Sequence, residues 1–142
     1  MNPTPRSPLV RVVLIEDFLG VRRRQRSLIE ESGRAEVVGE AHTDTRAMAL
    51  IRATAPDAVV LNLNLADGVG CGLLSEIKSA EPSCLVIVLT DFTTPEFRAL
   101  CLELGADHFL DKTREFGRLP DLLAERHRAL FPAHPPANPP QP

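Results

Sequence analysis

The sequence predicts an α/β fold, a doubly wound parallel sheet of five strands with five helices. Short apolar runs rich in β-branched residues alternate along the chain with segments in which apolar residues recur at helical spacing. The connections between these segments are short. Such alternation favours parallel strands joined through helices by right-handed crossovers, with helices on both faces of the sheet.

Five segments have the character of strands. The third is apolar on both faces (DAVVLNL), as a central strand between two helical layers must be. The first (VRVVLI) is β-branched and ends at an acidic pair, and the last is short. The predicted strands are residues 10–15, 36–41, 57–63, 84–89 and 108–110.

Helical patterns follow the strands. Thr43 or Asp44 is expected to cap the second helix, and Thr94 with Pro95 to begin the fourth, because hydroxyl caps and a proline in the first turn favour helix starts. Gly105 is expected to end the fourth helix. The residues expected to face the core are Phe18, Val21, Leu28 and Ile29, then Met48, Leu50 and Ile51, then Leu73, Leu74 and Ile77, then Phe97, Leu100, Cys101 and Leu104, and finally Leu119, Leu122, Leu123 and Leu130.

Length and composition suit one soluble domain. The chain has 142 residues, of which 44% are hydrophobic and 25% charged. A net charge of −3 gives no overall attraction to nucleic acid or to an anionic membrane, so neither is expected as a partner. Three cysteines, an odd number within apolar patterns, indicate reduced thiols in a cytoplasmic protein. The four histidines show no metal-ligand spacing and are expected at the surface.

The ends of the chain differ from its body. Residues 1–8 are proline-rich and lack the apolar run of a signal peptide. Six of the eleven residues after Phe131 are proline, which favours disorder. We therefore expect a disordered segment over residues 1–8, a folded domain over residues 9–130, and a disordered proline-rich tail over residues 131–142.

Polar residues stand where the predicted strands end. In doubly wound sheets, sites gather at the carboxyl ends of the strands. Carboxylate and amide oxygens there suit Mg²⁺, and a lysine with a hydroxyl suits a phosphoryl group. A nucleophile is missing, because the amide of Asn62 is not one. The residues concerned are Glu16, Asp17, Asn62, Asn64, Thr90, Asp91 and Lys112.

From Val10 to Leu130 the chain resembles the receiver domain of bacterial two-component response regulators. The resemblance rests on ordered segments at consistent spacing: VVLIED, EVVGEA, PDAVVLNLNLADGVG, VIVLT and GADHFLDK. It implies a flavodoxin-like receiver fold and places the phosphoacceptor aspartate of the family at position 62, where this chain has Asn62. The other positions that it implies are the Mg²⁺ ligands Glu16, Asp17, Asn62 and the backbone carbonyl of Asn64, the phosphoryl-site residues Thr90 and Lys112, and the switch aromatic Phe109.

The departures from the family pattern concern the site. Asn62 removes the nucleophile and one negative charge, so Mg²⁺ binding is expected to weaken. Asp91 stands where the family usually has a small residue, and Ala66 and Thr113 replace common prolines. The carboxylate of Asp91 would repel a phosphoryl group.

Two other aspartates are poor substitutes for the acceptor. Asp57 lies about five residues before position 62, which is roughly 16 Å along a strand. Asp67 is nearer but belongs to a loop, without the fixed position that in-line attack needs.

Two hypotheses follow. The first is a stand-alone receiver-like signalling module, without enzymatic activity and not phosphorylated at position 62, that binds a histidine kinase or another signalling protein. A homodimer through the fourth helix, fifth strand and fifth helix, with Arg98, Glu103, Asp111 and Arg114, is included in it. The second is an active single-domain response regulator whose natural residue 62 is aspartate, Asn62 being an engineered substitution. It would take a phosphoryl group from a phosphohistidine with Mg²⁺.

Two further observations remain. The first helix carries Arg22, Arg23, Arg24 and Arg26, which form a self-paired solvated face, since Arg26 and Glu30 are four residues apart, or a docking face for an acidic partner. A DNA-binding regulator is a weaker hypothesis because no helix-turn-helix follows. Small-molecule enzyme chemistry on such a sheet is weaker still, since the sequence has no G-x-G-x-x-G and no G-x-x-x-x-G-K-[ST] motif.

Overall fold

A computed structural model describes residues 8–63 and 70–132. The predicted alternation of strands and helices is confirmed, and each strand begins and ends within one residue of its predicted bounds. The elements are β1 (Val10–Ile15), α1 (Leu19–Glu31), β2 (Ala35–Ala41), α2 (Asp44–Thr54), β3 (Ala58–Leu63), α3 (Gly70–Ala80), β4 (Leu85–Thr90), α4 (Pro95–Glu103), β5 (His108–Asp111), a 3₁₀ turn η1 (Phe116–Arg118) and α5 (Leu119–Leu130).

The five strands form one parallel sheet in the order β2-β1-β3-β4-β5. Parallel pairing brings all carboxyl ends to one edge, where Leu63 of β3 is the register partner of Thr90, and Thr90 that of Asp111. The chain order reverses between β1 and β3, which is the topological switch point at which such folds place their sites.

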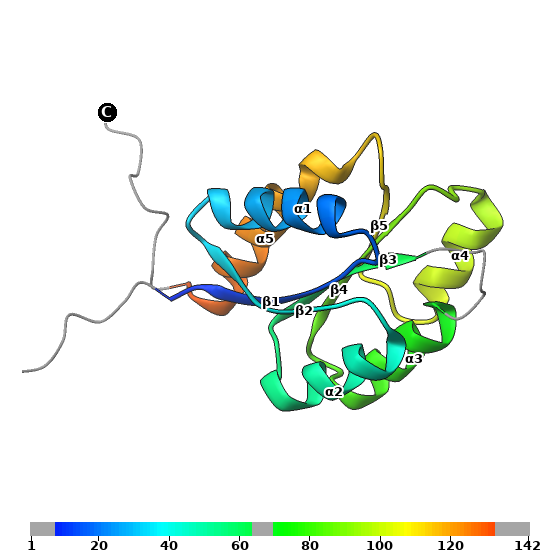
Figure 1. Ribbon diagram of the computed structural model, residues 1–142, viewed down its shortest axis with the longest axis horizontal. Coiled ribbons are helices and arrows are strands. Elements are labelled where there is room, and N and C mark those ends of the chain that lie inside the picture. The colour runs from blue at the N-terminus through cyan, green and yellow to red at the C-terminus, as the bar shows by residue number, and fades with distance from the viewer. Residues whose placement is uncertain (1–7, 64–69, 133–142) are drawn as a thin grey trace, which may run out of the picture.

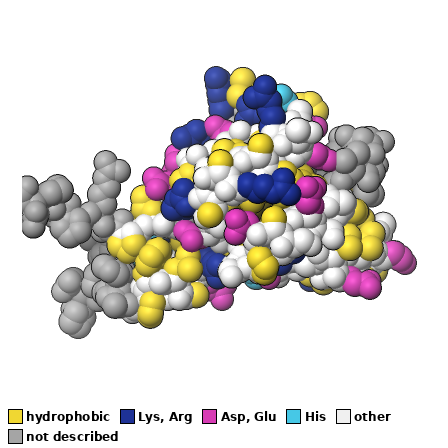
Figure 2. Space-filling view, turned by 90° about the horizontal axis from the view of Figure 1, so that it is seen from below, with side chains coloured by type: hydrophobic (Ala, Val, Ile, Leu, Met, Phe, Trp, Pro, Cys, Tyr) yellow, Lys and Arg dark blue, Asp and Glu magenta, His cyan; other side chains and the backbone are white. Residues whose placement is uncertain are grey.

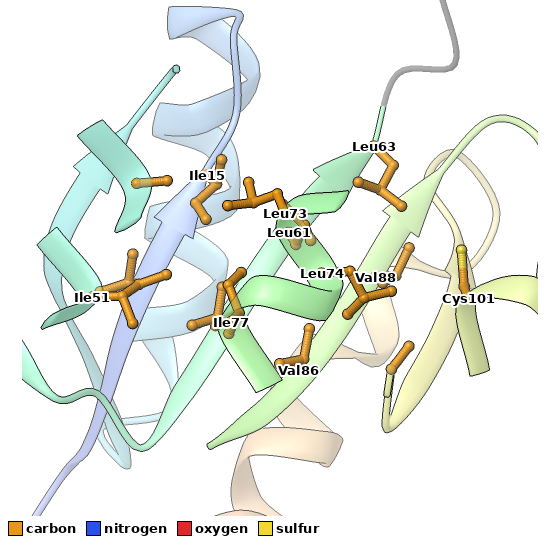
Figure 3. Close-up of a cluster of buried hydrophobic side chains, with 14 of the residues drawn as sticks. Ile15, Ile51, Leu61, Leu63, Leu73, Leu74, Ile77, Val86, Val88 and Cys101 are labelled. Atoms are coloured by element: carbon orange, nitrogen blue, oxygen red, sulfur yellow. The ribbon is translucent and has the colours of Figure 1, made fainter. Parts of the chain in front are cut away.

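Helices cover both faces of the sheet: α1 and α5 lie on one face, and α2, α3 and α4 on the other (Figure 1). Side chains alternate along β3, so Val59 and Leu61 pack toward α2 and α3 whereas Val60 packs toward α1 and α5. Figure 3 shows the larger of the two clusters of buried side chains, the one on the face covered by α2, α3 and α4, in which Ile77 of α3 lies over the strands. Burial on both faces explains why β3 reads as an almost continuous apolar run.

Local sequence signals set several helix ends. Thr43, one of the two predicted caps, accepts a hydrogen bond from the backbone N–H of Arg46 at 3.3 Å. Thr94 does the same for Phe97 at 3.2 Å. After α4, Gly105 adopts a φ of +115°, where an added Cβ would lie 2.6 Å from Lys78 Cγ, so this turn needs glycine on two grounds.

Three expectations about burial are wrong. Phe18 is 65% exposed, because it precedes α1 with extended backbone angles and therefore lies outside the helical repeat. Leu100 is 41% exposed, since α4 buries only Phe97 and Cys101. His127 is buried rather than at the surface, and its Nε2 lies 3.0 Å from the carbonyl oxygen of Pro8.

The surface carries charges of both signs. On the face seen in Figure 2, acidic and basic side chains are interspersed. Among the described residues, Arg52 of α2 and Glu76 of α3 form an ion pair, with 3.5 Å between Arg52 Nη2 and Glu76 Oε1. Within the described ranges, no helix is long and apolar enough to cross a membrane.

Candidate functional site

The ends of β1, β3, β4 and β5 enclose a cavity of about 250 Å³ at the carboxyl edge of the sheet. Four residues predicted for the site line it: Glu16, Asp17, Asn62 and Lys112. Asn64, the predicted backbone ligand, and Asp67, the alternative acceptor in the loop, lie outside the described residues. The lining is completed by Phe18, Leu63, Asp91 and Phe92.

Glu16 and Lys112 form an ion pair inside this site. Lys112 Nζ lies 2.7 Å from Glu16 Oε2, and only 2% of Glu16 is exposed. The other carboxylate oxygen, Oε1, accepts a hydrogen bond from the backbone N–H of Phe18 at 3.1 Å. Both oxygens of this acid therefore have partners within the chain, and the charge of Lys112 is balanced at the site.

Asn62 is held by three hydrogen bonds, and none of them involves the neighbouring site residues Lys112 and Thr90. Its Nδ2 donates to the carbonyl oxygen of Ile15 at 2.8 Å and to Gln25 Oε1 at 3.0 Å. Its Oδ1 accepts from Gln25 Nε2 at 2.9 Å. Lys112 is paired with Glu16 instead.

Gln25 is the residue that sequence reasoning missed. It lies on α1 and is 2% exposed. A signal was present: Val21, Gln25 and Ile29 are four residues apart, so one polar side chain interrupts an inward-facing stripe. A buried amide at such a position needs a hydrogen-bonding partner elsewhere in the fold.

The loops that follow β4 and β5 are joined at the mouth of the site. Thr113 Oγ1 donates a hydrogen bond to Asp91 Oδ1 at 3.0 Å. These are two of the positions at which the sequence departs from the family pattern, and they are partners of each other. Thr90 is fully buried beneath them, and its Oγ1 accepts from the backbone N–H of Phe92 at 3.1 Å.

Phe109, the predicted switch aromatic, lies in the core against α4. Its ring meets that of Phe97 edge to face, with centroids 5.9 Å apart. The guanidinium of Arg98 lies over the same ring at 5.6 Å and donates to the carbonyl oxygen of Phe109 at 3.2 Å. Phe109 thereby connects the end of the sheet to α4.

Three of the four residues predicted for a partner surface line a second cavity of about 260 Å³: Arg98, Asp111 and Arg114. Glu103 is exposed on α4. The backbone N–H groups of Arg114 and Thr113, each 2.9 Å from Asp111 Oδ1, lower the pKa of this carboxyl.

Two of the four arginines of α1, Arg22 and Arg26, pair with acidic residues. Arg26 lies 3.4 Å from Glu30, the predicted helical pair, and 2.8 Å from Glu40. Arg22 lies 3.3 Å from Glu40. These contacts agree with self-pairing for Arg22 and Arg26, whereas Arg24 lies over the ring of Phe116 at 4.9 Å.

Asp57 is far from the cavity. It immediately precedes β3, at the amino-terminal end of the strand, and its Oδ2 accepts the backbone N–H of Arg11 at 2.9 Å. The sheet geometry thus excludes it as a substitute for the acceptor.

The donors present do not fit a tight Mg²⁺ site. Glu16 is paired with Lys112, and the amide oxygen of Asn62 accepts from Gln25. Asp17 is exposed and lines the cavity. In the described part of the chain, no cluster of three or more His, Cys, Asp or Glu side chains could hold a metal ion.

Comparison with known proteins identifies the family. Residues 12–124 match the response regulator receiver domain. The DNA-binding transcriptional activator DevR/DosR of Mycobacterium tuberculosis is 34% identical over 104 residues, which are 73% of this chain and 48% of that protein. The KDP operon transcriptional regulatory protein KdpE of Escherichia coli is 32% identical over 113 residues, 78% of this chain and 48% of that protein. The chain thus spans about half the length of these relatives.

Solved structures agree. A LuxR-family two-component response regulator from Aurantimonas is 26% identical, with a TM-score of 0.77 over 85% of this chain and 86% of that one. A CheY-like receiver domain protein from Methanospirillum hungatei, 21% identical, shares the fold with a TM-score of 0.76 over 89% of this chain and 99% of that one. The sequence match, the parallel sheet and the acids and lysine at its carboxyl edge all place this chain in the response regulator receiver domain family.

Proposed function

We propose that this receiver domain is not phosphorylated at position 62, that it catalyses no reaction, and that it works by binding another signalling protein. Receiver domains interact with histidine kinases and other signalling proteins, so a histidine kinase is the first partner to test. The observation that carries the proposal is the side chain of Asn62, an amide at the centre of the site whose polar atoms are hydrogen-bonded within the chain. An amide offers no carboxylate oxygen to attack phosphorus.

The test exposes the protein and the Asn62→Asp variant to acetyl phosphate with Mg²⁺ and follows both by intact mass and amide NMR. We expect no added phosphoryl mass on the unsubstituted protein. A phosphoryl group gained by the unsubstituted protein would contradict the proposal. Beryllofluoride with Mg²⁺, which imitates an acyl phosphate only where a carboxylate can hold it, serves as the second probe.

A second candidate is an active response regulator whose natural residue 62 is aspartate. Its support is the rest of the site: Lys112, Thr90 and the acid pair stand at the strand ends as this candidate requires. The codon for residue 62 in the source gene separates the two candidates, because an aspartate codon there would establish Asn62 as an engineered change.

Any Mg²⁺ bound here is proposed to be weakly held. Receiver domains generally bind Mg²⁺ at the phosphorylation site. In this chain the substitution at position 62 removes a charge, and Glu16 is already neutralised by Lys112. The proposal is that Asp17 provides most of the remaining attraction for a cation.

For partners, we propose a protein rather than nucleic acid or a membrane surface, since the net charge is −3 and the arginines Arg22 and Arg26 are paired. The proposed surface is α4, β5 and α5, which we also propose as the contact of a homodimer. The three free cysteines support a reducing, cytoplasmic setting as part of this proposal.

A further inference from the structure

Gln25 and Asn62 form a reciprocal pair of side-chain amides. Gln25 Nε2 donates to Asn62 Oδ1 at 2.9 Å, and Asn62 Nδ2 donates to Gln25 Oε1 at 3.0 Å. The second N–H of Asn62 is used as well, since Nδ2 also donates to the carbonyl oxygen of Ile15 at 2.8 Å. Two amides and one backbone carbonyl thus tie α1, β3 and the end of β1 together.

This arrangement requires an amide at position 62. An amide has both a donor and an acceptor, whereas an ionised carboxylate has only acceptors. A carboxylate of the same shape would place an oxygen 2.8 Å from the oxygen of Ile15 and 3.0 Å from Gln25 Oε1. Turning the Gln25 amide over does not remove the conflict, because its oxygen would then face the other carboxylate oxygen.

We propose that Gln25 and Asn62 act as one unit, in which Gln25 selects an amide at the acceptor position and disfavours the carboxylate that phosphorylation needs. The inference rests on the proposed function, in which residue 62 accepts no phosphoryl group. It adds that two residues, rather than one, keep the site silent, and that restoring the acidic residue alone leaves an obstacle in place.

The position of Gln25 supports this inference independently of the contact distances. It is buried between Val21 and Ile29 on the inward stripe of α1, where an apolar residue would pack without needing a partner. Burying an amide costs free energy unless its donor and acceptor are satisfied. At position 25 the amide donates to Asn62 and accepts from Asn62. The buried amide of Gln25 is therefore explained by Asn62, and the amide of Asn62 by Gln25.

The first experiment is a double-mutant cycle on stability, with Gln25→Leu, Asn62→Ala and the double variant unfolded in urea. The free-energy changes of partners in contact are not additive, whereas those of distant residues are. If the two effects were additive in free energy, the unfolding constant of the double variant would be the unsubstituted value multiplied by both single fold-changes. We expect it to be about tenfold smaller than that product. Ser27→Leu, at an exposed position of the same helix, replaces Gln25→Leu in the control cycle, which should be additive. Additive effects for Gln25→Leu and Asn62→Ala would overturn the inference.

The second experiment measures phosphorylation by acetyl phosphate with Mg²⁺ in variants that carry the carboxylate. A carboxylate oxygen at position 62 attacks phosphorus, the bond from phosphorus to the acetyl oxygen breaks, and acetate leaves. We expect Gln25→Leu/Asn62→Asp to gain phosphoryl mass about tenfold faster than Asn62→Asp alone or Ser27→Leu/Asn62→Asp.

The outcomes separate this inference from the proposed function. Equal rates in the three carboxylate variants, zero included, would overturn the inference and leave the proposed function standing. Phosphorylation of the unsubstituted protein would overturn the proposed function, whereas the stability cycle would still report whether Gln25 and Asn62 act together.

Discussion

At the scale of single residues, the charged and polar side chains of the site are paired with other side chains of the same chain. Lys112 meets a buried carboxylate at 2.7 Å, and Asn62 meets Gln25 through two hydrogen bonds. A buried carboxylate depends strongly on its cationic partner, because removal of that partner leaves an uncompensated charge in a poorly solvated place. The same pairing occupies the carboxylate oxygen Oε2 of Glu16.

Lys112→Met is therefore expected to have two effects. It should destabilise the protein by about 3 kcal/mol, since Glu16 loses its partner. It should also make Mg²⁺ stabilising, because Glu16 and Asp17 then face the cavity with no internal cation between them. Both effects are measured by thermal unfolding, first without Mg²⁺ and then across a series of increasing Mg²⁺ concentrations.

Lys78→Met is the matched control. Lys78 also forms an ion pair, 2.9 Å from Asp107, and its side chain has the same 21% exposure as that of Lys112, but it lies away from the cavity. Its loss should destabilise without creating a response to Mg²⁺. If Mg²⁺ stabilises the two variants equally, the Glu16–Lys112 pair does not control cation access.

At the scale of elements, a series of contacts links the candidate site to α4. The Asp91–Thr113 hydrogen bond joins the loops on either side of α4 and β5, and Phe109 packs against Phe97 of α4. Arg98 contacts the ring of Phe109 and also lines the second cavity, together with Asp111 and Arg114. These contacts connect the carboxyl edge of the sheet to α4 and to the cavity that Arg98 lines.

The proposed homodimer through α4, β5 and α5 can be tested by reversing a charge on this face. The face carries Glu103 as well as Arg98 and Arg114, so under twofold symmetry the acid of one copy can meet a base of the other. Sedimentation velocity over a concentration series should show reversible dimerisation, and Glu103→Arg should raise the dissociation constant about tenfold.

Glu31→Arg, an equal charge reversal at the exposed end of α1, is expected to leave the dissociation constant unchanged. If the sedimentation coefficient keeps the value of a monomer at every concentration, the homodimer is contradicted. The α4–β5–α5 face would then be proposed only as a surface for other proteins. A loss of association in both variants would instead point to net charge as the cause.

At the scale of the whole molecule, two cores on opposite faces of one sheet stabilise the fold. Cys84 and Cys101 are buried in the core that α2, α3 and α4 cover, whereas Cys71 is half-buried at the start of α3. Burial, which disfavours the charged thiolate, raises the pKa of both Cys84 and Cys101 to about 12.

Reaction with a thiol reagent at pH 8 should consequently distinguish Cys71 from the other two cysteines. A thiol with a pKa near 12 is ionised at about one part in ten thousand at this pH, and the thiolate is the reactive form. We expect one fast equivalent per native chain and three after denaturation, measured with Ellman's reagent. The Cys71→Ser variant should lose the fast equivalent. Three fast equivalents in the native protein would contradict this packing.

The sequence by itself determined the order of the elements, the double burial of β3 and the gathering of Glu16 and Lys112 at one edge of the sheet. These follow from local periodicity and from the rule that parallel strands end at one edge of a sheet. Helix caps such as Thr94 were predictable for the same reason, because the cap and the N–H groups that it serves are neighbours in the chain.

The tertiary structure alone decided which side chains meet across elements. Asn62 and Gln25 are 37 positions apart, and Asp91 and Thr113 are 22 apart. Periodicity indicates the face on which a residue lies, but not the side chain that another element brings against it. That choice depends on how helices pack on the sheet and on which donors and acceptors remain unsatisfied once they do. The amide pair at the centre of this site is therefore a property of the fold.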